Sequence, residues 1–212
     1  MKTKVISCDV FRWMFNETDY PNYDFTYIEV ARHNEPLKLN KALQQLIDES
    51  SNYENIILLY GLCGNSIIGL TSKVPLYVFR AHDCSSILLG NRSEFINHRW
   101  CSDALYKCEY YGDLNNSSYE EYVEKYGEHA DYLWEMLKKD DTLYYVTMNT
   151  DSDDETMKNL EKEGYTIEKV LVGTDEVVKA MLNRQKHPMI FELTSNKQIE
   201  GVYDFEEIIT MK

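Results

Sequence analysis

The feature that most constrains the fold is a continuous apolar stretch, residues 55–62, with the sequence Asn-Ile-Ile-Leu-Leu-Tyr-Gly-Leu. A strand that is apolar on both sides has to be covered on both faces, which is typical of parallel sheets. Residues 74–79 have the same character and follow soon after. Helical patterns alternate with these segments along the chain. We therefore predict an α/β fold, a three-layer sandwich with a mainly parallel sheet.

The first hundred residues predict the order β-β-α-β-β-α. Asn34 is a typical N-cap and Pro36 suits the first turn of a helix that runs to about Ser51. Four aliphatic residues share one face of that helix: Leu39, Leu43, Leu46 and Ile47. The predicted strands cover 4–11, 25–30, 55–62 and 74–79, and a second helix covers 84–95.

The rest of the chain resumes this alternation after an aromatic and polar segment, 100–116, that we expect to be irregular or a hairpin. A capping box at 118–121 starts a helix. Strands then follow at 143–148 and 166–172, helices at 155–163 and 175–183, and a closing antiparallel pair at 189–193 and 203–210. No linker rich in Gly, Ser or Pro interrupts the chain, so we predict a single domain over residues 1–212.

Composition excludes several classes of function. The formal net charge is -14 over 212 residues, so nucleic acid and anionic membranes would be repelled. No apolar run approaches the length of a membrane helix, and no leader-like segment precedes the first strand. Five cysteines without a disulfide-scaffold spacing favour a reducing, cytoplasmic compartment.

Each of the first four predicted strands ends in a cysteine or a histidine. These residues are Cys8, His33, Cys63 and the pair His82 and Cys84. If the strands are parallel neighbours, the five side chains gather at one edge of the sheet, where open α/β sheets bind ligands. Sulfur and imidazole groups collected there predict a metal site or a site of thiol chemistry.

The first hypothesis is a metal- or metallocofactor-handling protein. Cys8, Cys63, His82 and Cys84 would supply the four ligands that zinc, iron or cobalt takes in a tetrahedral site. The spacing is not that of a zinc finger, so this hypothesis depends on topology. Taken singly, each of these residues is also explained by burial in a core. Further contacts to the metal or a bound small molecule would come from His33, Tyr60, Asn65, Arg80 and Asp83.

The alternative hypothesis is a cysteine-dependent transferase or hydrolase. Cys63 lies in a Gly-rich turn that resembles a nucleophile elbow, although Asn65 occupies the position where the elbow has its second Gly. His82 would be the general base, oriented by Asp83 or Glu29.

Three weaker patterns point to other sites. A phosphate-binding site is one of them, but the glycines at 61, 64 and 69 are too widely spaced for a dinucleotide fingerprint. Arg80 could bind an anion, although an ion pair with Asp83 or with a helix end is the simpler interpretation. The acidic run 151–155 departs from a calcium loop, and we predict a solvated loop that caps the next helix. Cys101, Cys108 and His98 could form a second metal site, but two unrelated thiols are the simpler interpretation.

Two sequence blocks, Tyr-Gly-Leu-Cys-Gly-Asn at 60–65 and Arg-Ala-His-Asp-Cys at 80–84, together with Leu-Leu-Gly at 88–90, resemble the bacterial and archaeal family known as domain of unknown function 1638. Residues 32–36 and Cys8 are similar to two further blocks of that family. The resemblance implies an association with anaerobes and with corrinoid-dependent methyl transfer, and hence a corrinoid as a further candidate cofactor. The chain departs from the family pattern at 101–111, where a Pro-Gly-Thr-Tyr run is expected.

Overall fold

The computed structural model describes residues 2–12, 14–30, 32, 35–88, 99–102, 106, 123–124, 127, 142–147, 151–162, 164–171, 175–202 and 208–212. The chain divides into two compact units, one of residues 1–92 and 173–212 and one of residues 93–172. A division by contacts does not test whether the units fold independently, so the single domain over 1–212 stays a prediction. No helix in the described ranges is long and apolar enough to cross a membrane.

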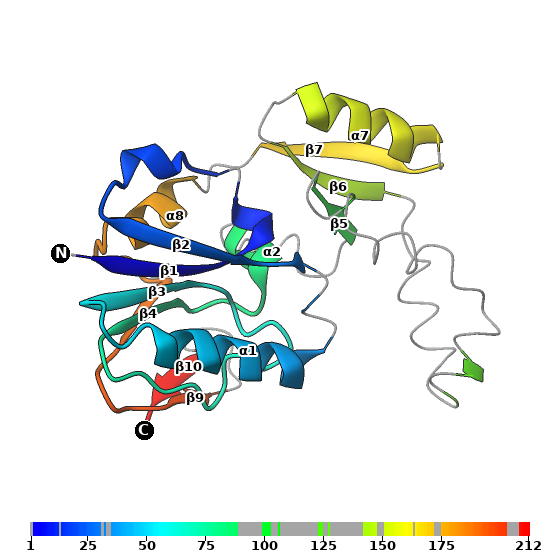
Figure 1. Ribbon diagram of the computed structural model, residues 1–212. Coiled ribbons are helices and arrows are strands. Elements are labelled where there is room, and N and C mark those ends of the chain that lie inside the picture. Colours follow the sequence, from blue (N-terminus) through cyan, green and yellow to red (C-terminus); the bar gives the residue numbers. More distant parts are fainter. Residues whose placement is uncertain are drawn as a thin grey trace. The chain divides into compact units, whose positions relative to one another are not determined.

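The first unit is built on a five-stranded sheet (Figure 1). The strand order is β2-β1-β3-β4-β8, and only β8 is antiparallel to its neighbour. The predicted mixed α/β fold with a mainly parallel sheet is therefore confirmed. The strands are β1 (Thr3–Cys8), β2 (Tyr23–Ile28), β3 (Asn55–Leu59), β4 (Leu76–Phe79) and β8 (Ile190–Leu193).

Burial explains the order of the strands. Every residue of β1 and β3 is buried, as expected for central strands, whereas the edge strand β2 is half-exposed. The parallel registers pair Ser7 with Leu59 and Leu58 with Val78, so β1, β3 and β4 end close together. Two short 3₁₀ helices, Asp9–Phe11 and Glu17–Asp19, lie between β1 and β2.

Helix α1 (Pro36–Glu49) begins at the proline that the sequence placed in its first turn. Of the four residues of the predicted apolar face, Leu39, Leu43 and Ile47 are buried and Leu46 is half-buried. Glu35 precedes the helix as N-cap and makes no side-chain capping bond, while Asn34, the predicted cap, lies outside the described residues.

Two further helices belong to this unit, α2 (Cys84–Leu88) and α8 (Asp175–Leu182). The predicted continuation of α2 to residue 95 lies outside the described residues.

The prediction of a closing antiparallel pair was wrong in its partners. Strand β8 hydrogen-bonds to β4, and β10 (Ile209–Met211) pairs with β9 (Ile199–Gly201) in a separate two-stranded sheet. The open edge of β4 offers β8 a row of main-chain partners, which a pattern of apolar residues alone does not reveal.

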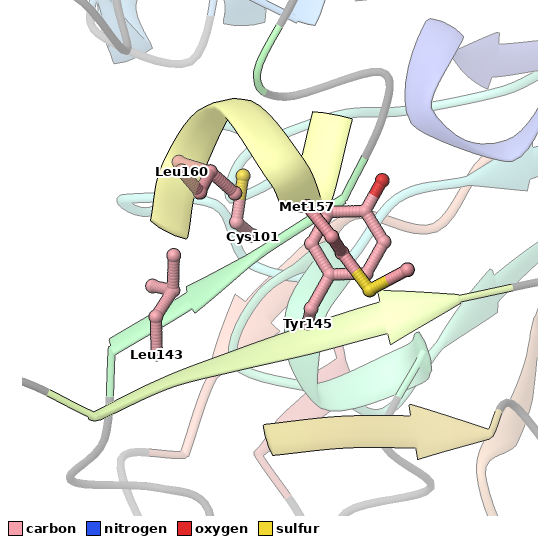
Figure 2. Close-up of a cluster of buried hydrophobic side chains, with 5 residues drawn as sticks. All are labelled: Cys101, Leu143, Tyr145, Met157 and Leu160. Atoms are coloured by element: carbon pink, nitrogen blue, oxygen red, sulfur yellow. The ribbon is translucent and has the colours of Figure 1, made fainter. Parts of the chain in front are cut away.

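The second unit contains three parallel strands, β5 (Arg99–Cys101), β6 (Thr142–Thr147) and β7 (Thr166–Leu171), and helix α7 (Asp151–Lys162). Strand β5 pairs in parallel with β6, so its described residues are not part of a hairpin. The helix predicted from residue 118 lies almost wholly outside the described residues. Figure 2 shows the core cluster, with side chains from β5, β6 and α7: Cys101, Leu143, Tyr145, Met157 and Leu160.

Cys101 belongs to this core, where its thiol donates to the carbonyl oxygen of Ser102 at 3.4 Å. Its two proposed companions, Cys108 and His98, lie outside the described residues.

The acidic run at 151–155 was predicted to be a loop, and this prediction was wrong, because α7 begins at Asp151. Acidic residues stabilise the positive end of a helix dipole, so they suit the first turn itself. Asp153 is buried and accepts hydrogen bonds from the hydroxyls of Tyr145 and Thr147, each at 3.0 Å.

Candidate thiol site at the strand ends

Three cysteines meet where β1, β3 and β4 end. Cys8 is the last residue of β1, Cys63 follows β3, and Cys84 opens α2 after β4. The sulfur atoms of Cys63 and Cys84 lie 3.5 Å apart, and Cys84 also hydrogen-bonds to Cys8. We name Cys8, Cys63 and Cys84 the thiol cluster. All three are free thiols, although they lie far apart in the sequence.

Backbone contacts between two turns hold this cluster together. The N–H of Leu62 donates to the carbonyl of Ala81 at 2.8 Å, and the N–H of Cys63 donates to that of His82 at 2.9 Å. A Cβ atom at Gly61 would lie 2.8 Å from Ala81 O and 2.8 Å from the N of Asp83. Only glycine therefore allows the turn after β3 to approach the turn after β4 this closely.

The turn that carries Cys63 has an uncommon backbone. Three consecutive residues have positive φ angles, 44° at Cys63, 68° at Gly64 and 68° at Asn65. Such angles are unfavourable for residues other than glycine and persist where surrounding contacts impose them. Here Asn40 of α1 donates from its side-chain amide to the carbonyls of Ser66 and Ile68, which fastens the turn to the helix.

The hydrogen bonds of the thiol cluster shift the pKa values of Cys8 and Cys84 in opposite directions. The hydrogen bond from Cys84 lowers the pKa of Cys8 and outweighs the burial that would raise it. The hydrogen bonds to Cys63 and Cys8, together with burial, raise the pKa of Cys84 well above its ordinary value. Cys84 is therefore the thiol that retains its proton, and Cys8 becomes the thiolate more readily.

Tyr60 adds a phenol to the same site. The side chain is 2% exposed, and its buried hydroxyl has no hydrogen-bond partner within the part of the chain that the structure describes. Burial raises the pKa of Tyr60 well above its ordinary value, and the charges of Cys8, Cys84 and Cys63 add to this effect. The hydroxyl is thus a neutral hydrogen-bond donor whose ionisation the three cysteines oppose.

His82 and Asp83 follow β4 as predicted, in the turn that contacts Gly61. The described contact of His82 with the cluster is through its carbonyl oxygen, which accepts from Cys63. The exposed carboxylate of Asp83 accepts from the N–H and the hydroxyl of Ser86, at 2.7 and 2.8 Å, and caps the first turn of α2. Asp83 therefore positions the helix that carries Cys84.

The other predicted site residues have separate positions. The guanidinium of Arg80 lies over the ring of Phe191 in β8, 4.9 Å from its centroid. Asn65 and Glu29 are exposed, and His33 lies outside the described residues. The assignment of these residues to a ligand or to catalysis stays a prediction. The roles of Gly61 and Asn40 were not predicted: the motif contained Gly61, but no sequence signal points to Asn40.

The distance between the sulfur atoms of Cys63 and Cys84 is close to that between two ligands of one metal ion. A tetrahedral zinc ion with Zn–S bonds of about 2.3 Å places neighbouring sulfurs about 3.8 Å apart. The 3.5 Å between Cys63 and Cys84 is close to this distance. Across the described residues, no group of three or more His, Cys, Asp and Glu side chains is placed so that it could hold a metal ion. The spacing of this one pair is compatible with a shared ion, and a third ligand would have to move toward it.

Comparison with known proteins identifies a family. A family model described as "Protein of unknown function (DUF1638)" matches residues 27–181, which include Cys63 and Cys84 but not Cys8. No curated protein matches the chain. No solved structure matches it either.

Proposed function

The chain belongs to the family of proteins of unknown function DUF1638, and we propose that its thiol cluster binds a soft metal ion, either alone or within a metallocofactor. The observation that carries the proposal is the convergence of three free thiols from three strand ends, with two sulfurs 3.5 Å apart. Zinc, iron and cobalt are the ions that thiolate ligands bind in this way.

The polar groups that surround the three cysteines support this proposal over simple burial of the cysteines in a core. An isolated buried cysteine behaves as a small apolar side chain and needs no polar neighbour. The thiol cluster instead combines three hydrogen-bonded thiols with the buried Tyr60 hydroxyl, which has no hydrogen-bond partner among the described residues. A polar group of this kind is costly in a core unless a bound species compensates it.

A metallocofactor form of the same proposal is a corrinoid, whose cobalt is the reactive metal. This form comes from what the sequence resemblance implies, an association with corrinoid-dependent methyl transfer in anaerobes. For an ion bound alone, the ligands proposed from this chain are Cys8, Cys63 and Cys84, with His82 as a fourth. A corrinoid cobalt, which its ring already holds with four nitrogens, would take at most two of them.

The fold and the setting belong to the proposal as well. Complete burial of β1 and β3 supports helices on both faces of the sheet, a three-layer arrangement. Free thiols 3.5 Å apart support a reducing compartment, the cytoplasm, because an oxidising one would favour their disulfide. A small molecule or metallocofactor is the proposed partner, and the net charge of -14 argues against nucleic acid and anionic membranes.

Elemental analysis of protein purified without oxygen, and then offered Zn²⁺, Co²⁺ or Fe²⁺, tests the proposal. We expect about one equivalent of metal per chain. The double variant Cys63→Ala, Cys84→Ala should lose it. The control Cys101→Ala, which removes a thiol from the core of the second unit, should keep it. Absence of stoichiometric metal from the unaltered protein would refute the proposal.

One observation favours a second function, cysteine-dependent transfer or hydrolysis. Cys63 has a φ of 44° in a sharp turn after a strand, as the strained nucleophile of an elbow does. Alkylation of Cys63 below neutral pH at a rate well above that of a model thiol would support this function. A rate no higher than the model thiol's would exclude it.

A further inference from the structure

Two of the free thiols lie next to each other without a covalent bond. The sulfur atoms of Cys63 and Cys84 are 3.5 Å apart, and both residues are free thiols. A disulfide bond is about 2.0 Å long, so the two sulfurs would have to approach each other by about 1.5 Å. Rotation about the Cα–Cβ bonds of the two residues moves the sulfurs while the backbone stays in place.

The backbone holds the two cysteines together independently of their side chains. The N–H of Cys63 donates to the carbonyl of His82 at 2.9 Å, two residues before Cys84. A Cβ atom at Gly61 would lie 2.8 Å from the N of Asp83, so the turn before Cys63 also contacts the residue before Cys84. Each thiol is therefore presented to the other at a high effective concentration.

Exposure distinguishes this pair from the other described thiols. Cys84 is half-buried, so a small reagent can reach it from solvent, whereas Cys8 is only 5% exposed. Cys101 is fully buried in the core of the second unit, where it bonds to the carbonyl of Ser102. Among the described thiols, Cys63 and Cys84 are thus the two that combine a measured sulfur contact with access from solvent.

We infer that Cys63 and Cys84 form a redox-active dithiol, which a hydroperoxide oxidises to an intramolecular disulfide. One sulfur attacks the peroxide: an S–O bond forms, the O–O bond breaks, and the thiol proton leaves with the departing oxygen, as water in the case of hydrogen peroxide. The other sulfur then attacks the sulfenic acid: the S–S bond forms, the S–O bond breaks, and the second thiol proton leaves in another water. The dithiol loses two electrons and the peroxide gains them, whichever sulfur reacts first.

This modification site goes beyond the proposed metal binding and does not depend on it, because it needs two sulfurs and no further ligand. A disulfide would occupy two of the three sulfurs of the thiol cluster. Oxidation and the proposed metal binding would therefore exclude each other, since metal ions bind thiolates.

Peptide mapping of the full chain tests the inference. Reduced, metal-free protein is treated with hydrogen peroxide in its folded state, alkylated and digested with trypsin. Lys73 and Arg80 lie between Cys63 and Cys84, and Lys or Arg residues separate all five cysteines, so each cysteine falls in its own peptide. We expect the loss of two of the five free thiols, a cross-link between the peptides of Cys63 and Cys84, and recovery of all five thiols with dithiothreitol.

Three variants provide the controls. Cys101→Ala and Cys8→Ala should form the same cross-link, since neither change removes a sulfur of the pair. Cys84→Ala should not form it. Protein oxidised in denaturant should give mixed pairings, because the folded backbone no longer selects the partner.

The outcomes separate this inference from the proposed metal binding. Thiol loss without a cross-linked peptide, or cross-links in folded protein that join Cys8 to either residue as readily as Cys63 to Cys84, would overturn the inference and leave metal binding standing. If the disulfide forms in a protein that takes up no metal, the inference stands and metal binding is refuted.

Discussion

At the scale of single residues, the proposed metal binding depends on which thiol holds its proton. Metal ions bind thiolates, so each thiol that becomes a ligand has to lose its proton. The pKa of Cys84 is raised well above its ordinary value, chiefly by its hydrogen bonds to Cys63 and Cys8. The need to remove the proton from Cys84 would therefore oppose the proposed metal binding at neutral pH.

The pH dependence of affinity follows from this. Because Cys84 is protonated in the metal-free protein, the affinity for Co²⁺ should rise with pH, by about tenfold per pH unit for each proton displaced. Spectroscopic titrations between about pH 6 and pH 8 measure this slope. Cys84→Ser, which removes the thiol with the raised pKa, should bind more weakly and with a smaller slope. An affinity independent of pH would contradict thiolate coordination.

Asp83 provides a second prediction, which separates capping from ligand binding. Its carboxylate caps α2 through Ser86, so Asp83→Ala should lower the free energy of unfolding by about 1 kcal/mol. Asp83→Asn keeps a capping oxygen and should retain both stability and cobalt affinity. Denaturant titration and cobalt titration of the two variants measure this. Loss of cobalt affinity in Asp83→Asn would instead show that the negative charge acts on the metal.

Only part of the site could be predicted from the sequence. The strand-end position of Cys8, Cys63 and Cys84 was visible because parallel strands bring their carboxyl ends to one edge. The hydrogen bonds among the thiols and the capping role of Asp83 depend on side-chain rotamers and on a helix start, which no spacing rule encodes.

At the scale of elements, two turns carry the site, and their contact at Gly61 sets its geometry. The atoms that a Cβ at this position would meet belong to the backbone of Ala81 and Asp83, which cannot move aside as a flexible side chain can. Strands were predicted well where burial is continuous, as in β1 and β3. The pairing of β8, β9 and β10 was not predicted correctly. Short strands pair through the hydrogen-bonding groups of backbone edges, and the pattern of residue types contains little information about these.

Gly61→Ala tests the contact between the turns. Forcing the turns apart should cost about 1–3 kcal/mol of stability and should weaken cobalt binding, since Cys63 and Cys84 lie on opposite sides of the contact. Gly164→Ala is the control: it also introduces strain, at a φ of 100°, but meets no atom within 4 Å and lies in the second unit. Equal cobalt affinity in both variants would show that the contact does not position the cysteines.

At the scale of the whole molecule, the site lies within the first compact unit, residues 1–92 and 173–212. A ligand stabilises the part of a protein whose unfolding releases it, by about 2.7 kcal/mol at a concentration a hundred times the dissociation constant. The division into units therefore predicts where a bound metal should slow local opening.

Hydrogen exchange with and without Zn²⁺ measures this effect. Amides of β1, β3 and β4 should exchange more slowly in the zinc-bound protein, whereas those of β6 and β7 should be unchanged. Equal protection of both sheets would instead show that residues 1–212 unfold as one cooperative domain.

X-ray absorption spectroscopy of the zinc-loaded protein tests the central claim most directly. Coordination by the thiol cluster predicts three sulfur neighbours at about 2.3 Å and one lighter ligand at about 2.0 Å. The double variant Cys63→Ala, Cys84→Ala should give no such sulfur shell. A spectrum of the unaltered protein with only nitrogen and oxygen neighbours would contradict the account.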